Sequence, residues 1–274
     1  MGTVDLHLHT TASDGNLSPT ELLDLLDRRG LKIAAITDHD STNGILEAQA
    51  ANKDITLISG IELSADAPGT EAHILGYYLR WQDPTFQQVL KRFRDDRLER
   101  AREMVFELSK LGIHLEIERV LQLADGAVGR PHIAQAMIEK RYVKDNREAF
   151  DKYLGREGAV YVSRTKFPPK DAIELIQSVG GVAVLAHPTF VNNLEDRLAE
   201  MVEAGIAGIE VYYSKYEPDV VRDLARLADR FGLIPCGGSD YHAFGIDGET
   251  LPGEAGPPEV SVRALETLAA KSRG

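Results

Sequence analysis

Short apolar runs alternate along most of the chain with longer segments in which apolar residues recur every three or four positions. The short runs are typical of buried strands, and the periodic segments are typical of amphipathic helices. This alternation predicts βα units around a mainly parallel sheet, an α/β fold. The predicted strands cover residues 3–9, 32–37, 56–62, 72–79, 182–187, 208–213 and 233–239.

Three periodic segments carry helix-boundary signals. The first begins with Ser18 and a proline, and Glu21 follows at the third helical position, which is the spacing of a capping box. The other two are preceded by proline and followed by glycine. We therefore predict helices over residues 18–29, 169–179 and 219–231.

The middle of the chain breaks this alternation. A long charged helical pattern, KRFRDDRLERAREMVFELSKLG, leads into shorter helical segments, and no strand-like run follows until AVYVS. We interpret residues 86–166 as a helical insertion in a barrel-like domain made of residues 1–85 and 167–274. The glycine- and proline-rich stretch 245–258 is predicted to be a loop before the last helix.

Charge follows the same division. The 274 residues include 31 Lys and Arg against 43 Asp and Glu, a formal net charge of −12. Residues 86–170 hold 18 basic and 13 acidic side chains, net +5, so the rest of the chain is net −17. The acidic excess disfavours nonspecific binding to polyanions, and we expect no long duplex nucleic acid as a partner.

The single cysteine, Cys236, excludes an internal disulfide framework and a thiolate metal cluster. The N-terminal residues lack the pattern of a signal peptide, and no apolar run is long enough to cross a bilayer. We expect a cytoplasmic protein without a membrane partner.

Most of the eight histidines fall where a predicted strand ends. Two of them lie two residues apart and therefore on one face of a strand. At the carboxyl ends of barrel strands such side chains share one rim. His73, which opens its strand, needs an antiparallel or irregular element to join them. The candidate metal ligands are His7, His9, Asp14, His39, Glu62, His73, His187, Asp240 and His242.

Nine nitrogen and oxygen donors exceed what one ion needs, so we expect two or three divalent cations. Without thiolates the set suits Mn, Fe or Zn better than Mg, and Mn is the first candidate. A single buried histidine is more often a hydrogen-bonded core or loop residue. The complete set, with His-x-His at the first strand and Asp-x-His at the last, is hard to explain by packing.

In their order along the chain, these motifs resemble the ligand series of the PHP (polymerase and histidinol phosphatase) domain family. The resemblance covers residues 1–80 and 170–274, and the motifs that carry it are His-x-His, Asp14, ITDH, GxE, His73, His-Pro and SDxH. The resemblance implies a distorted (β/α)7 barrel related to the amidohydrolases, a trinuclear metal centre and phosphoesterase activity. It assigns His7, His9, Glu62 and Asp240 to one ion, Glu62 as a bridge with His73 and His187 to the second, and Asp14, His39 and His242 to the third.

In such a centre a metal-bound hydroxide attacks phosphorus. The leaving ribose oxygen then needs a proton, for which Asp14, His242 and a metal-bound water are alternatives.

A second phosphate away from the metals needs arginine or lysine. In RLERAR, Arg97 and Arg100 share a helix face, and a merely solvated face is the alternative. In GRPHIA, Arg130 and His132 lie at a predicted helix start, which also favours anions, and an ordinary helix start is the alternative. Weaker candidates are Arg164 and Lys166.

The PHP ligands together with RLERAR and GRPHIA resemble the branch of 3',5'-nucleoside bisphosphate phosphatases and 5'-to-3' exoribonucleases. This implies removal of the 3'-phosphate from pAp-like nucleotides, which gives a nucleoside 5'-monophosphate and phosphate, and we assign the second phosphate to the basic insertion. The expected partner is a small phosphorylated nucleotide, with short RNA as a further partner class.

Two other phosphoesterase activities are alternatives: a 5'-to-3' exoribonuclease on short RNA and a histidinol phosphatase, whose cationic substrate would favour an acidic pocket. Outside phosphoesterases, a metal-stabilised scaffold would not need nine occupied ligand positions. An amidohydrolase acting on an amide or lactone would leave the basic insertion unexplained.

Overall fold

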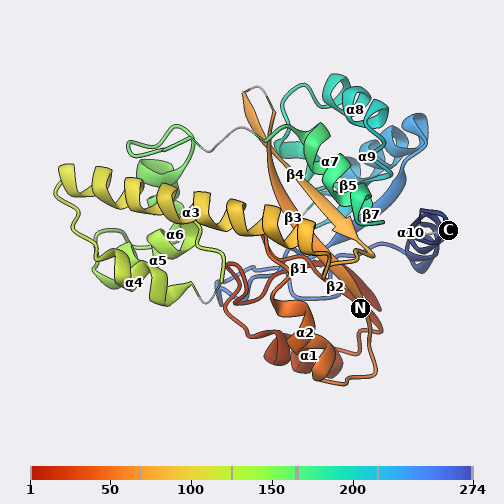
Figure 1. Ribbon diagram of the computed structural model, residues 1–274, viewed down its shortest axis with the longest axis horizontal. Coiled ribbons are helices and arrows are strands. Elements are labelled where there is room, and N and C mark those ends of the chain that lie inside the picture. The colour runs from red at the N-terminus through yellow and green to blue at the C-terminus, as the bar shows by residue number, and fades with distance from the viewer. Residues whose placement is uncertain (1, 68, 125, 164–166, 215, 273–274) are drawn as a thin grey trace.

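The computed structural model describes residues 2–67, 69–124, 126–163, 167–214 and 216–272. Seven strands form one sheet in chain order, curled into a nearly closed barrel (Figure 1). This confirms the predicted α/β fold, a distorted barrel with a helical insertion. The strands are β1 (Val4–Leu8), β2 (Ile33–Ile36), β3 (Thr56–Ala67), β4 (Thr70–Tyr77), β5 (Val182–Leu185), β6 (Gly208–Tyr213) and β7 (Ile234–Gly238).

The sheet is parallel except around β4, which is antiparallel to both of its neighbours. Strands β3 and β4 form a long hairpin in which His73 pairs with Ser64. Because β4 runs backwards, a residue near its start lies at the same rim as the carboxyl ends of the parallel strands. This is the antiparallel element that His73 requires.

Strands β1 and β7 close the barrel through contacts near their carboxyl ends. A parallel bridge joins Leu8 to Tyr241, and the Asp240 N–H donates to the His7 carbonyl at 2.9 Å. The buried Asp5 carboxylate accepts backbone N–H groups from His7, Ser239 and Gly253 at 3.0–3.2 Å. Asp5 therefore ties the first strand to the chain that follows the last.

Helix α1 has the predicted capping box. Ser18 Oγ accepts the Glu21 N–H at 3.3 Å, and the Glu21 carboxylate accepts the Ser18 N–H at 2.9 Å. Helices α2 and α8 were not predicted, and residues 159–163 form no strand. The helices are α1 (Pro19–Arg28), α2 (Gly44–Ala50), α3 (Pro84–Lys110), α4 (Ile117–Leu123), α5 (Arg130–Glu139), α6 (Asn146–Ala149), α7 (Pro169–Ser178), α8 (Leu194–Glu203), α9 (Pro218–Phe231) and α10 (Glu259–Lys271), with a π-turn at Phe150–Leu154 and a 3₁₀ turn at Pro188–Phe190.

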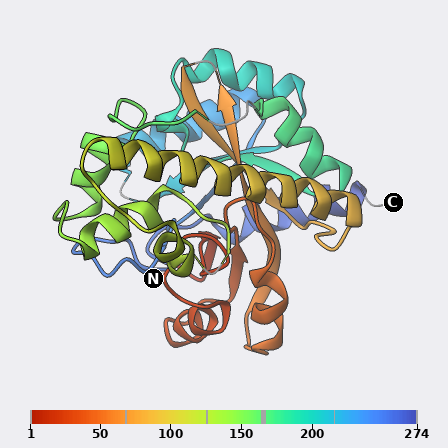
Figure 2. The same cartoon turned by 60° about the vertical axis from the view of Figure 1, so that its left-hand side comes forward.

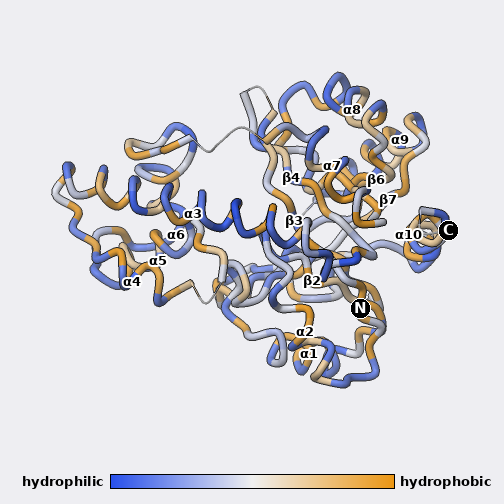
Figure 3. The backbone as a smooth tube through the Cα atoms, viewed as in Figure 1, coloured by the Kyte–Doolittle hydropathy of each residue, from blue (hydrophilic) through white to orange (hydrophobic). Residues whose placement is uncertain are grey.

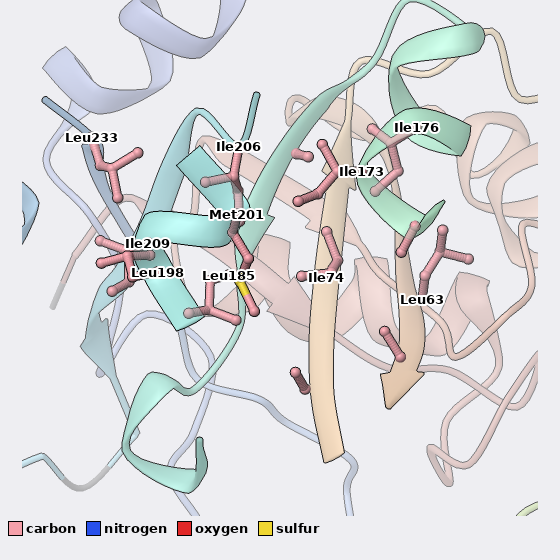
Figure 4. Packing of buried hydrophobic residues seen from close by; sticks show 14 of the residues in the cluster. Leu63, Ile74, Ile173, Ile176, Leu185, Leu198, Met201, Ile206, Ile209 and Leu233 are labelled. Atoms are coloured by element: carbon pink, nitrogen blue, oxygen red, sulfur yellow. The ribbon is translucent and has the colours of Figure 1, made fainter. Parts of the chain in front are cut away.

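Helices α7, α8 and α9 cover the outer face of one half of the barrel. Their apolar side chains pack with strand residues such as Leu63 and Ile209 in a single buried cluster (Figure 4). Ile176 of α7 approaches Gly76 so closely that a Cβ there would lie 2.9 Å from its Cγ1. Burial of this face, at about 25 cal/mol per Å² of apolar surface, holds the helices on the sheet.

Helices α3 to α6 extend to one side of the barrel, and α3 crosses in front of it (Figures 1 and 2). They share their own buried cluster, which includes Met104, Leu108, Ile133 and Met137. Many residues of α3 are hydrophilic (Figure 3). Among the described residues, none of the helices combines the length and hydropathy that a bilayer crossing needs.

Candidate metal centre

Three predicted ligands from the two ends of the chain converge. His7 lies in β1 and His9 directly after it; both side chains are buried, with ring centroids 5.2 Å apart. Asp240, which follows β7, places Oδ1 3.3 Å from Nε2 of His7 and 3.1 Å from Nε2 of His9. The closure of the barrel therefore brings these donors to one point.

Glu62 of β3 lies at the centre of the cluster. Its Oε2 is 3.3 Å from Nε2 of both His7 and His9 and 3.0 Å from Nδ1 of His39. Its Oε1 is 2.8 Å from Nδ1 of His73 and 3.0 Å from Nε2 of His187. One carboxylate thus contacts five imidazoles, an arrangement that suits a bridge between two cations.

Asp14 lies at the edge of the cluster, close to His39 and His242. Its Oδ2 is 3.8 Å from Nε2 of His39, and its Oδ1 is 3.4 Å from Nε2 of His242. The rings of His9 and His242 stack with centroids 4.1 Å apart. The structure therefore brings all nine predicted ligands into one continuous cluster.

The donor set fits divalent cations. Ligand atoms that each lie about 2.1 Å from one ion are about 3 Å from each other, which is the spacing seen here. Three groups have ligand atoms within 4.8 Å of one another: His9, Asp14, His39 and His242; His7, His9 and Asp240; and His39, Glu62 and His73. Among the candidate ligands, six buried atoms have no hydrogen-bond partner in the described part of the chain: Nε2 of His7, both ring nitrogens of His9, Oδ1 of Asp14, Nδ1 of His39 and Oε2 of Glu62. Bound cations would satisfy these lone pairs.

Imidazoles and carboxylates in the cluster shift each other's pKa. Burial alone would lower the pKa of His9, but Asp240 and Glu62 raise it to about 10. Burial alone would raise the pKa of Glu62, but the neighbouring imidazoles hold it well below its usual range. Burial lowers the pKa of His39 to about 3, so its ring is neutral. The carboxylates are therefore ionised, as metal ligands must be.

Glu210 is a site residue that we did not predict from the sequence. It is wholly buried in β6; its Oε1 accepts from His7 Nδ1 at 3.0 Å, and its Oε2 accepts the His187 backbone N–H at 2.7 Å. It orients one ligand and anchors the loop of another. Its signal in the sequence is a lone acid inside the apolar strand GIEVYY.

Two further supporting residues, Asp38 and Tyr213, were also missed. The buried Asp38 carboxylate accepts the Thr10 N–H and the hydroxyls of Thr10 and Ser13, each at 2.7 Å, and so fixes the loop that carries Asp14. The Tyr213 hydroxyl donates to Asp240 Oδ2 at 2.7 Å. Asp38 has no signal in the sequence beyond its place beside His39, and Tyr213 has none beyond its place at the end of a predicted strand.

Three predicted arginines of the insertion lie beside the metal ligands. Arg97, Arg100 and Arg130 line a cavity of about 200 Å³ whose wall also includes Asp14, His39 and His73.

Each arginine is held in place. Arg97 Nε donates to Asp40 at 2.7 Å, Arg100 Nε donates to the Val162 carbonyl at 2.7 Å, and Arg130 Nη2 donates to Glu71 at 2.8 Å. A basic cavity with ordered guanidinium groups therefore adjoins the metal centre.

The other predicted substrate contacts are placed differently. The ring of His132 is buried and Nδ1 accepts the Gly129 N–H at 2.9 Å, so it caps the start of α5. His132 is absent from the described lining of this cavity, and burial lowers its pKa. Its predicted contact with substrate stays untested. Arg164 and Lys166 lie outside the described residues.

A wider cavity of about 510 Å³ opens over the metal ligands. Its lining includes Glu62, His73 and His187 together with the aromatic side chains of Phe150 and Phe190. It leaves room for a substrate larger than phosphate.

Comparison with known proteins gives consistent results. The model of the PHP domain family matches residues 5–160. The chain is 36% identical to a 3',5'-nucleoside bisphosphate phosphatase of Chromobacterium violaceum, over 92% of this chain and 91% of that protein. It is 35% identical to a 5'-3' exoribonuclease of Haemophilus influenzae, over 87% of this chain and 89% of that protein. A solved structure of a metal-dependent phosphoesterase from Bifidobacterium adolescentis superposes with a TM-score of 0.89 at 27% identity, over 97% of this chain and 96% of that one.

Proposed function

The chain belongs to the PHP domain family of metal-dependent phosphoesterases, and we propose that it removes the 3'-phosphate of 3',5'-nucleoside bisphosphates. The products are a nucleoside 5'-monophosphate and phosphate. One observation carries this choice: Arg97, Arg100 and Arg130 share a cavity with metal ligands. A simple phosphomonoester needs only the metal centre, whereas a bisphosphate needs a second cationic site beside it.

The nine clustered side chains would hold two or three divalent cations, with Mn as the first candidate and Fe or Zn as alternatives. We propose that these ligands are divided among three ions in the way that the resemblance to the PHP domain family implies. When bound, such cations neutralise phosphate oxygens and lower the pKa of a water molecule for in-line attack on phosphorus. Glu62, the central carboxylate, keeps the donor atoms at their spacing.

The leaving ribose oxygen must receive a proton. Burial alone would raise the pKa of Asp14, but His39 and His242 hold it well below its usual range, so Asp14 is ionised and His242 would supply the proton. Their side chains lie 3.4 Å apart at the edge of the cluster. His242 Nδ1 donates to the Asp240 carbonyl at 2.9 Å, which directs Nε2 toward Asp14 and the metal centre. His242 can therefore carry the proton while the Asp14 carboxylate orients its ring.

We assign the second phosphate to the insertion, residues 86–166, as a substrate-recognition subdomain. Carboxylate partners hold Arg97 and Arg130 in position before substrate arrives. Arg130 also lies over the rings of Phe150 and Tyr161, at 5.6 and 6.0 Å from their centroids. Pre-ordered guanidinium groups lose little entropy when they bind phosphate.

The test compares kcat/KM for pAp, histidinol phosphate and p-nitrophenyl phosphate. We expect Arg130→Ala to raise KM for pAp about tenfold or more, because a charge-assisted contact is lost, and to spare p-nitrophenyl phosphate. Arg222→Ala, an exposed arginine of α9, is the control. Equal losses on both substrates, or a wild-type preference for histidinol phosphate, would reject the assignment.

A 5'-to-3' exoribonuclease acting on short RNA is the second candidate. The cavity of about 510 Å³ over the metal ligands can admit a nucleotide chain, and the relative from Haemophilus influenzae is named for this activity. The same arginines would then bind the 5'-phosphate of the RNA. Release of mononucleotides from a 5'-phosphorylated oligomer at a rate that rivals pAp turnover would favour this candidate.

A further inference from the structure

A second cavity, of about 580 Å³, adjoins the cavity over the metal ligands. Gly69, at the tip of the β3–β4 hairpin, and Arg156 line both. The wall of the second cavity also includes Tyr161, Lys170 at the start of α7 and Arg197 of α8. The second cavity is therefore a neighbour of the cavity over the candidate ligands, with Arg156 between them, and the bisphosphate reaction does not use it.

The basic side chains around this second cavity have N–H groups without a hydrogen-bond partner among the described residues. Within the described chain, the Arg156 side chain forms no hydrogen bond or ion pair. Arg197 pairs through Nη1 with Glu200 at 3.1 Å, but its Nε is buried and has no partner among the described residues. Lys170 is exposed, and its ion pair with Glu174 is weak because the two charged atoms are as far as 3.7 Å apart. An unsatisfied buried donor is costly and points to a missing acceptor.

The start of α7 adds further donors. This ten-residue helix begins at Pro169, and its N-cap residue, Pro168, provides no side-chain cap. Both prolines and Lys170 line the cavity, so the uncapped end of the helix faces it. The free N–H groups and the positive end of the helix dipole favour an anion there.

The carboxylates in the wall do not cancel this charge. Asp66 and Glu200 line the cavity with Arg156, Lys170 and Arg197, and Glu200 is already paired with Arg197. The wall therefore keeps a positive balance. Tyr161 also lies in this wall, and the guanidinium groups of Arg100 and Arg130 lie 5.3 and 6.0 Å from the centroid of its ring.

We propose that this second cavity binds the phosphodiester and nucleoside that follow the scissile phosphate in a short oligoribonucleotide. The inference rests on the proposed action on nucleotides. The volume of the second cavity lies in the range of ligand sites, and the basic side chains in its wall suit a phosphodiester. A nucleoside bisphosphate has no group beyond the two phosphates and the base, so the cavity distinguishes oligonucleotides from mononucleotides.

The test uses the double variant Lys170→Gln, Arg197→Gln in the full-length protein. We expect the ratio of kcat/KM for a 5'-phosphorylated triribonucleotide to that for pAp to fall about tenfold, because two contacts to phosphate are removed. The exposed pair Lys91→Gln, Arg226→Gln is the matched control. An unchanged ratio in a folded double variant overturns the proposal.

A binding measurement separates this proposal from the proposed function. Fluorescence anisotropy would follow a labelled, 5'-phosphorylated 2'-O-methyl trinucleotide without added metal, on wild type, the double variant and the exposed single variant Lys170→Glu. Weaker binding by both variants supports the cavity even if wild type hydrolyses neither pAp nor RNA, in which case only the proposed function fails. Unchanged binding overturns the cavity whichever substrate is hydrolysed.

Discussion

Glu210 illustrates how a residue that binds no metal can shape the centre. Its carboxylate accepts from His7 Nδ1 and from the His187 backbone, so it sets the tautomer of one ligand and the position of another. In Glu210→Gln the amide can accept only one of these two hydrogen bonds. We expect the affinity for Mn²⁺ to fall about 10- to 100-fold, measured by calorimetric titration.

The exposed Glu217→Gln, at the start of α9, is the control for Glu210→Gln. If both variants bind Mn²⁺ as tightly as wild type, Glu210 does not position the ligands.

Asp240 tests the charge of the centre rather than its shape. Asp240→Asn keeps the side-chain size but removes the negative charge that faces His7 and His9. We expect kcat for p-nitrophenyl phosphate to fall at least about 100-fold, because bound metal would lose an anionic ligand.

Tyr213→Phe is the matched contrast, because it removes only the hydrogen bond to Asp240 Oδ2 and keeps the charge. A kcat of Asp240→Asn above one tenth of wild type would contradict a ligand role.

One contact between the insertion and the barrel is made by backbone atoms alone. The Ala127 N–H donates to the Ala12 carbonyl at 3.1 Å, and a Cβ on Gly126 would lie 2.1 Å from the same oxygen. The loop of Ala12 carries Asp14. The docking of this segment is thus coupled to the shape of the metal centre.

Gly126→Ala would therefore force these two segments apart. We expect a loss of about 1–3 kcal/mol in the free energy of unfolding, measured in urea, together with weaker metal binding. Gly129→Ala is the control, since its Cβ would meet its nearest atom only at 3.3 Å. Equal losses in the two variants would show that this close approach is unimportant.

At the scale of elements, the sequence predicted all seven strands but not the full hairpin. Strands β3 and β4 extend toward each other to Ala67 and Thr70, beyond the apolar runs at 56–62 and 72–79. Apart from Leu63 the added residues are polar or small, and cross-strand pairing keeps them extended. The helix α1, by contrast, was predictable because its capping box is a local signal.

At the scale of the whole molecule, bound cations would stabilise the closed barrel, because they would link donors from its two ends. The ligands come from both sides of the junction between β1 and β7, which backbone contacts near their carboxyl ends bridge. We expect saturating Mn²⁺ to raise Tm by roughly 5–10 °C over the chelator-treated protein, measured by scanning calorimetry.

Mg²⁺ at the same concentration should raise Tm less, because imidazole is a poor ligand for it. A Tm that is independent of metal in a protein whose activity requires it would contradict a structural contribution of the centre.

The sequence by itself determined the strands and the nine candidate ligands, because donors at strand ends and strand periodicity are local patterns. Only the tertiary structure decided which groups support those ligands and how the arginines are oriented. Glu210 lies 203 positions from His7, and Glu71 lies 59 positions from Arg130. No local pattern encodes such pairs, since strand order and the docking of the insertion bring them together.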